Sequence, residues 1–147
     1  MLHIRMMKPN YKRIEEIEFG QLKGLMKELG YELKTPQIVQ NIQEIRSRGG
    51  EVFVAKINEI VVGCVCTIID VRLAAGINGE IVSLVVSEHY RGIGIGKGLV
   101  ELAESWLKQR VARIRVRANI TRFKAHEFYI KAGYQELKTQ KIFEKYV

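Results

Sequence analysis

The chain contains 147 residues, of which 47% are hydrophobic and 27% charged, and this length and composition predict one globular domain over residues 1–147. The longest apolar stretch, residues 60–69, is well short of the roughly 20 residues that a membrane-spanning helix needs, so we expect a buried strand there. Residues 1–5 lack the basic, apolar and small-residue segments of a secretory signal, and we therefore expect a cytoplasmic protein.

Positive charge is in excess, because 24 Lys and Arg face 16 Asp and Glu, for a formal net charge of +8. Such an excess favours a polyanionic partner, either nucleic acid or a phosphorylated cofactor. The two cysteines, Cys64 and Cys66, share one face of an expected strand and are poorly placed to bond with each other. We interpret them as reduced core residues, and the three scattered histidines supply no ligand spacing, so no metal is expected.

The first third of the chain predicts a short strand and two helices. The strand is expected near residues 2–6, and apolar residues then recur at helical spacing over residues 14–29, where Gly30 ends the first helix. Thr35, as N-cap before Pro36, begins a second amphipathic helix that runs to Gly49-Gly50.

The middle third predicts a hairpin and a central strand. The Val- and Ile-rich residues 51–57 and 60–70 are separated only by Asn58-Glu59, which is the length of a tight hairpin loop. Residues 73–79 are expected to form a loop. Residues 80–86 are almost wholly apolar after the first position, which predicts a strand in the middle of the sheet.

The last third predicts a helix over residues 94–110, a strand over 112–118 and a second helix around 125–132, which Gly133 ends. The order strand, helix, strand makes a parallel crossover. Residues 134–137 and 141–147 alternate well enough to predict one or two closing strands.

Three arginines, Arg113, Arg115 and Arg117, alternate with apolar residues in the expected strand at 112–118 and therefore share one face. A solvated strand face is the simpler interpretation. A surface for a polyanion is the alternative.

The most informative segment is residues 84–97, in which an apolar strand passes through a glycine turn into a helix. The first amides of a helix have no partner inside it and carry the positive end of its dipole, and glycines let a phosphate approach the backbone closely. Four alternating glycines over residues 92–98 each weaken a helix start by about 1 kcal/mol relative to alanine. The segment therefore predicts a phosphate-binding turn.

Two common phosphate-binding motifs do not fit. The dinucleotide fingerprint G-x-G-x-x-G fails, because Lys97 or Leu99 stands where the last glycine is required. The nucleotide P-loop fails as well, since only three residues separate Gly92 from Gly96-Lys97, where the motif needs four, and Gly98 replaces the Ser or Thr.

The pattern Arg/Gln-x-x-Gly-x-Gly does fit at Arg91, Gly94 and Gly96, and it resembles the pyrophosphate loop of the GNAT superfamily of acyl-CoA-dependent N-acyltransferases. Residues 61–63, 80–86 and 125–134 resemble, in order and spacing, the third strand, the fourth strand and the last helix of that family. The resemblance covers nearly the whole chain.

The resemblance implies an α/β (α+β) fold with about four helices and a mixed, mostly antiparallel twisted sheet of about six to seven strands, splayed between the fourth and fifth. Acetyl-coenzyme A would lie in the gap as cosubstrate, with its pantetheine arm on the backbone of Leu84, Val85 and Val86. An amide near Leu84 or Val85 would also polarise the thioester carbonyl. The pyrophosphate would be held by the turn that contains Gly92, Ile93, Gly94, Ile95, Gly96 and Lys97.

Side chains for proton transfer also follow from the resemblance. Glu80 stands where several family members carry a general base, and Asp70 is the weaker candidate. Tyr129 resembles the tyrosine that faces the coenzyme sulfur, and its phenol would protonate the departing thiolate, although it also continues the apolar stripe of its helix. Asn119 would contact the pantetheine or cap the following helix.

The predicted activity is therefore transfer of an acetyl group to a primary amine by direct attack in a ternary complex. A non-catalytic coenzyme A sensor and a basic nucleic-acid-binding module are the alternatives. No motif marks the acceptor, a small molecule or a protein, although Tyr31, Glu32, Asp70 and Glu136 would attract a cationic amine. A homodimer through an edge strand of the carboxy-terminal region is also expected.

Overall fold

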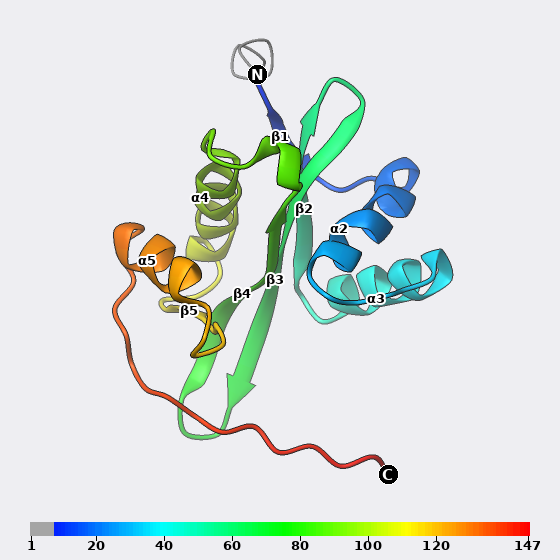
Figure 1. Cartoon of the computed structure of the whole chain (residues 1–147). Helices are drawn as coiled ribbons and strands as arrows, with labels where there is room; N and C mark the ends of the chain where they lie inside the picture. The colour runs from blue at the N-terminus through cyan, green and yellow to red at the C-terminus, as the bar shows by residue number, and fades with distance from the viewer. Residues whose placement is uncertain (1–7) are drawn as a thin grey trace. The chain divides into compact units, whose positions relative to one another are not determined.

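A five-stranded sheet in the order β1-β2-β3-β4-β5 organises the first part of the chain (Figure 1). The computed structural model describes residues 8–147. Successive strands from β1 to β4 pair antiparallel, and β4 pairs with β5 parallel, which confirms the mixed, mostly antiparallel sheet. The strand expected at residues 2–6 lies outside the described residues. The strands are β1 (Asn10–Arg13), β2 (Glu51–Ile57), β3 (Ile60–Arg72), β4 (Gly76–Val86) and β5 (Ile114–Val116).

Helices cover both faces of this sheet. On one face lie α2 (Leu22–Glu28) and α3 (Thr35–Ser47), and α4 (Ile95–Lys108) lies on the other (Figure 1). The first predicted helix is divided, because its beginning is a 3₁₀ helix, η1 (Glu16–Gln21). The N-cap of α3 is Lys34 rather than Thr35, and the Lys34 amide donates to Gln37 Oε1 at 2.8 Å.

The apolar stripes of α2 and α3 pack on side chains that alternate along the central strands, and this packing forms the main core. Cys64 and Cys66 belong to that core and are free thiols, as predicted. Other buried members include Leu22, Leu25, Ile38, Ile42, Val52, Val54 and Val85.

The β3–β4 hairpin is longer than predicted. Residues 76–79 were expected in a loop, but they pair with Ile69–Arg72 of β3, so only residues 73–75 form the turn. Gly79 indicates why the sequence is misleading here, because a Cβ at this position would lie 2.7 Å from the Leu107 side chain. The glycine is thus required by close packing of α4 on the strand rather than by a turn.

Residues 117–147 form a second compact unit. It contains α5 (Phe123–Lys131), and Gly133 follows it with φ +97°, as expected for a glycine that ends a helix. The closing strands expected at 134–137 and 141–147 are wrong, because the structure assigns no strand to residues 134–147. An alternating pattern predicts a half-buried face, but it does not predict the hydrogen-bonded neighbour that a strand needs. The described residues therefore contain five strands instead of six or seven.

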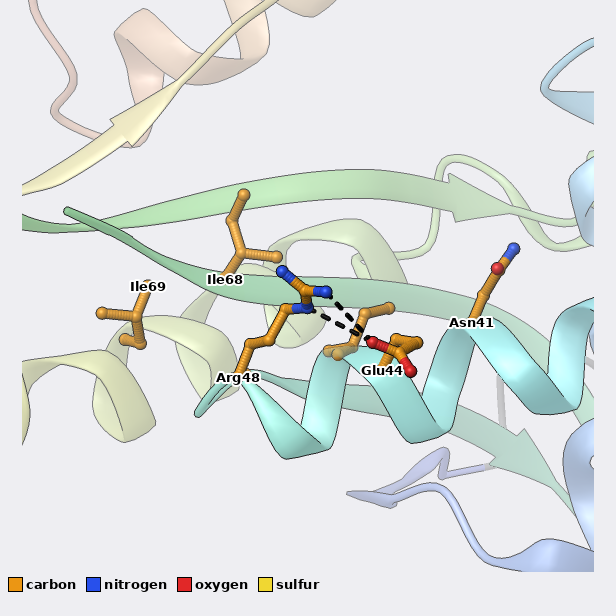
Figure 2. A pocket seen from close by; sticks show the side chains of 7 residues that line it. Asn41, Glu44, Arg48, Ile68 and Ile69 are labelled. Carbon is orange, nitrogen blue, oxygen red and sulfur yellow. Dashed lines mark hydrogen bonds and ion pairs between the residues drawn. The ribbon is translucent and has the colours of Figure 1, made fainter. Parts of the chain in front are cut away.

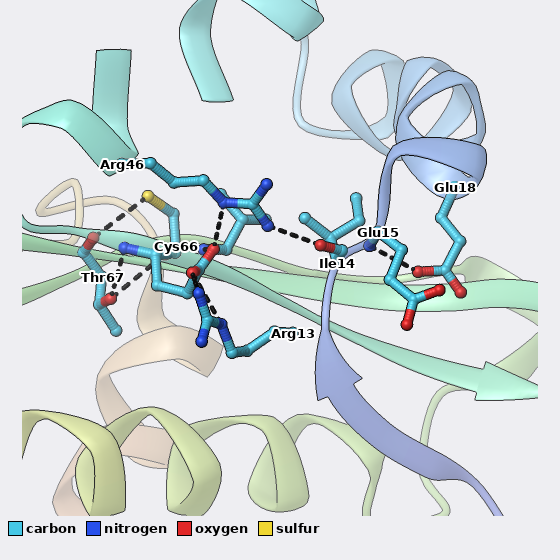
Figure 3. Close-up of polar contacts among 9 residues, drawn as sticks. Arg13, Ile14, Glu15, Glu18, Arg46, Cys66 and Thr67 are labelled. Atoms are coloured by element: carbon cyan, nitrogen blue, oxygen red, sulfur yellow. Dashed lines mark hydrogen bonds and ion pairs between the residues drawn. The ribbon is translucent and has the colours of Figure 1, made fainter. Parts of the chain in front are cut away.

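A buried carboxylate fixes the start of β2 to its neighbours, among them Arg13 and Arg46 (Figure 3). The Glu51 side chain is 2% exposed and accepts hydrogen bonds from Arg13 Nε at 2.9 Å, Arg46 Nε at 2.8 Å and the Val52 amide at 2.9 Å. Arg46 also donates to the Ile14 carbonyl at 2.6 Å. These bonds connect β1, α3 and β2 at one point of the fold.

Within residues 8–147, no helix combines the length and the apolar character that crossing a membrane requires.

Candidate functional site

A bulge interrupts β4 halfway along its length. Cys64 of β3 pairs with Val85, and Cys66 pairs with Val82. Between these two pairs β4 therefore contains one residue more than β3. Ser83 adopts φ +54° at the bulge, a left-handed conformation that is uncommon outside glycine. Bulges of this kind bend a strand and end its pairing, often beside functional sites. The bulge is not predictable from the sequence, since serine carries no local signal for it.

Beyond the bulge, the β5 side of β4 has no strand partner among the described residues. β5 pairs only with Gly79–Ile81, which confirms that the sheet opens between its fourth and fifth strands. The Ser87 amide donates to Val62 of β3 at 2.8 Å, so alternation turns the backbone of Val86 toward the open edge. Val85 instead faces β3, and its side chain is buried in the core.

The strand then enters the predicted glycine turn through a short 3₁₀ helix, η2 (Glu88–Tyr90). Gly92 has φ +80°, and Gly94, the N-cap of α4, has φ +89°. A Cβ at either position would meet no atom within 4 Å, so the space above both glycines is open. The Ile93 side chain is half-buried.

The amides at the start of α4 face this open space without a partner inside the helix. The Gly98 amide is bonded to the Gly94 carbonyl at 3.0 Å, and the amides before it belong to the first turn, which has no intrahelical acceptors. Ile95 is 1% exposed and anchors the turn, whereas Lys97 is exposed. Open space, outward amides and the helix dipole fit the pyrophosphate of a coenzyme.

Arg91 stabilises the beginning of the glycine turn through side-chain hydrogen bonds. Its Nε donates to the Val86 carbonyl at 2.9 Å, and its Nη2 lies 3.4 Å from Glu28 Oε1 of α2. Glu28 also accepts from the Glu88 amide at 2.9 Å. These bonds hold the end of β4 and the beginning of the turn in place.

Gly98 requires a different explanation from the one that the sequence suggested. A Cβ at Gly98 would lie 2.3 Å from the Tyr11 ring of β1. This glycine is therefore needed for close packing of α4 against β1 and not for phosphate binding.

The candidate general base lies on the α2 and α3 side of β4. Glu80 is 8% exposed, and its neighbours in the register are Ile68 of β3 and Arg115 of β5. The alternative base, Asp70, accepts from Arg72 Nε at 2.8 Å near the hairpin tip, so its carboxylate is already paired.

The arginines that share one face of the expected strand at 112–118 are not all solvated. Arg113 is exposed, yet its Nε donates to Asn78 Oδ1 at 2.8 Å. Arg115 is half-buried. Alternation placed these arginines on one face but gave no signal for their partners on β4.

Two predicted site residues, Tyr129 and Asn119, belong to the second unit. Tyr129 is half-buried on α5, where burial raises the pKa of its phenol against a smaller opposite effect of Arg122. It therefore stays protonated at neutral pH, as an acid must. Asn119 Oδ1 accepts from the Thr121 amide at 3.0 Å, which stabilises the turn before α5.

The side chains expected to attract an acceptor come from different segments of the chain. Tyr31 and Glu32 are exposed in the segment before α3, and Glu136 is exposed in the second unit. Among residues 8–147, no group of three His, Cys, Asp or Glu side chains is arranged to hold a metal ion.

Burial raises the pKa of Cys64, with a smaller contribution from Cys66, to about 12. Burial likewise raises the pKa of Cys66, with a smaller contribution from Glu51, to about 12. Both thiols are therefore protonated at neutral pH, as is typical of buried structural cysteines.

The open edge, the glycine turn and the helix start together form an anion-binding arrangement at the edge of a mixed α+β sheet. The acetyltransferase (GNAT) family model matches residues 14–134, and the chain belongs to this family. No curated protein matches the chain.

Solved structures share the fold at low identity. An acetyltransferase from Trypanosoma brucei is 20% identical, with a TM-score of 0.80 over 94% of this chain and 100% of that one. Glucosamine-6-phosphate N-acetyltransferase from Arabidopsis thaliana is 19% identical, with a TM-score of 0.79 over 95% and 98%. An aminoglycoside N-acetyltransferase in complex with CoA is 14% identical, with a TM-score of 0.82 over 95% of each chain.

Proposed function

We propose that this protein transfers an acetyl group from acetyl-CoA to a primary amine by direct attack within a ternary complex. The observation that carries the proposal is the open edge of β4 beyond Ile81, which leads into a glycine turn with outward helix amides. Family membership supports acetyl-CoA as the donor, and one relative of the same fold was solved with CoA.

Backbone groups would do most of the binding. Leu84 and Val86 would pair with the pantetheine arm as a neighbouring strand does, while Val85 supports them from the core. The amides of the turn, from Gly92 to Lys97, would donate to the pyrophosphate, and Lys97 adds a nearby positive charge. Asn119 is proposed to contact the pantetheine arm in addition to its turn bonds.

Two side chains would move the protons. Glu80, directly or through water, accepts a proton from the ammonium substrate, so that the free amine forms a bond to the carbonyl carbon. The Leu84 amide stabilises the negative charge on the carbonyl oxygen. As the carbon–sulfur bond breaks, the Tyr129 hydroxyl gives its proton to the departing thiolate, and the phenolate that results takes the second proton from the nitrogen, which leaves the neutral amide and free CoA. A route through an acyl-enzyme would need a reactive nucleophile on the protein. Both cysteines are buried and protonated, which favours direct attack by the amine.

Thermal denaturation with and without acetyl-CoA tests the coenzyme site. A ligand at 100 times its dissociation constant stabilises the folded state by about 2.7 kcal/mol. We expect acetyl-CoA to raise the melting temperature, and Gly94→Leu to abolish the rise, because the side chain would occupy the space where the pyrophosphate approaches.

Gly30→Leu is the matched control. Gly30 also has a positive φ, +99°, and open space around it, so the backbone strain is the same while the glycine turn is untouched. A melting temperature that acetyl-CoA leaves unchanged and a dinucleotide raises would contradict the proposal. Coenzyme binding without turnover of any amine would favour the sensor, and tight DNA binding that falls by decades with salt would favour the nucleic-acid module.

A further inference from the structure

A polar strip crosses the α3 side of β4 and β5. The side chain of Ile68 packs against the core under α2 and α3, and its partner in the register, Glu80, shares that face. Asn78 lies two residues earlier on the same face and accepts from Arg113 Nε. Arg115 is aligned with Glu80 in the parallel register and continues the strip on β5.

Arg115 has a nitrogen that the protein does not satisfy. Among residues 8–147, its Nε is the one buried side-chain nitrogen or oxygen without a hydrogen-bond partner. Arg113 differs, since its Nε is bonded to Asn78 and its Nη2 donates to the Ala75 carbonyl at 3.2 Å. Buried polar atoms are nearly always paired, and a guanidinium cannot lose its charge to escape the cost. A water or an acceptor atom of a bound ligand would satisfy this nitrogen, which the register places beside Glu80.

A cavity of about 430 Å³ lies where α3 approaches β3 (Figure 2). Ile68 connects the two features, because it lines this cavity and also pairs with Glu80. The volume suits a small organic molecule. The lining is apolar at its base, and the Glu44–Arg48 ion pair stands at its side.

We propose that the acceptor is a small primary amine with an oxyanion one or two carbons from the nitrogen, and that Arg115 binds this oxyanion. The inference rests on the proposed function, in which Glu80 takes the proton of the amine. Adjacent strands are about 4.8 Å apart, so groups bound by Arg115 and Glu80 belong to neighbouring carbons. A guanidinium pairs with carboxylate and phosphate alike, and the two arginines disfavour polycationic amines.

Matched acceptor pairs test the proposal. We would measure kcat/KM at saturating acetyl-CoA for β-alanine against β-alaninamide, and for phosphoethanolamine against ethanolamine, with spermidine as the polycation. We expect the anionic member of at least one pair to exceed its neutral partner by about tenfold or more, as for one charge-assisted hydrogen bond. The pair that shows the larger ratio identifies carboxylate or phosphate as the oxyanion.

Arg115→Gln should bring that ratio to near one, whereas Arg115→Lys, which keeps the charge but loses the fork of donors, should retain part of it. Lys108→Gln is the control, because it removes an equal charge from an exposed position on α4, which covers the opposite face. All variants should keep the stabilisation by acetyl-CoA.

A second readout does not require turnover. With CoA present, the preferred anionic amine should raise the melting temperature of the wild type more than its neutral partner does, and the difference should vanish in Arg115→Gln. Equal ratios in the wild type, preference for spermidine, a ratio that Arg115→Gln leaves unchanged, or no binding of any anionic amine would each overturn the inference. If neutral amines are still acetylated, the proposed function survives; if acetyl-CoA does not bind, the proposed function itself fails.

Discussion

Glu80 and Tyr129 have opposite tasks in the proposed reaction, and pH should separate their contributions. Tyr129→Phe keeps the ring and removes only the hydroxyl, so we expect coenzyme affinity to survive and kcat to fall by roughly 100-fold, as for the loss of a general acid. Because the pKa of Tyr129 is raised by burial, the phenol stays protonated well into the alkaline range. The defect should therefore be constant across neutral pH.

Glu80→Gln should behave differently, since a missing base matters less when the substrate is already deprotonated. Its activity is expected to recover toward the wild-type rate as pH rises and free amine accumulates. The measurement is kcat against pH for both variants, with coenzyme release shown not to limit the rate. Wild-type turnover of Tyr129→Phe would make the tyrosine a packing residue, and a pH-independent loss in Glu80→Gln would make the glutamate a positioning residue.

At the scale of elements, the carboxylate of Glu51 joins β1, α3 and β2, so its charge contributes to stability. Burial alone would raise the pKa of Glu51, but the Val52 amide, Arg46 and Arg13 together hold it below the ordinary value. A lowered folded-state pKa means that this contribution is fully present above the unfolded-state pKa, near 4.3, and disappears as pH falls through the folded-state value.

We therefore expect Glu51→Gln to lower the free energy of unfolding by about 3 kcal/mol at pH 7, because it leaves Arg46 and Arg13 without their carboxylate. The difference from wild type should shrink below pH 4.3 as the wild-type carboxylate is protonated. Urea denaturation at pH 7 and at several lower values measures both effects. Glu44→Gln is the control, since its ion pair with Arg48 is exposed and should contribute little. A pH-independent difference would show that the charge is not the cause.

The same elements show what local sequence reveals about this fold. Periodicity and glycine position predicted α3, α4 and the Asn58 hairpin, because these depend on residues close in the chain. The contact of Gly98 with Tyr11 is a tertiary approach between distant segments, and no local pattern indicates it. Ser83 in the bulge is likewise held by its neighbours on β3 rather than by its own preference. In the candidate site, the glycine turn could be predicted from the sequence. The alignment of Arg115 beside Glu80 could not, because it depends on the register of two strands.

For the whole molecule, the segment after α5 presents apolar side chains to solvent. Residues 134–147 form no helix or strand, and Leu137, Ile142, Phe143 and Tyr146 are between 68% and 90% exposed. A segment outside helices and strands that exposes apolar side chains is a ready template for association with another chain.

We expect this segment to pair with a second copy of the chain, because a symmetric dimer buries two such segments at once and β5 has an outer edge that no described strand covers. The expected result is a dimer mass by light scattering at tens of micromolar. Phe143→Glu should shift the population to monomer, since a charge would be buried in the interface, whereas Lys145→Gln, an exposed polar change in the same segment, should not. A wild-type protein that is monomeric at this concentration would contradict the prediction. A dimer unaffected by Phe143→Glu would place the interface elsewhere.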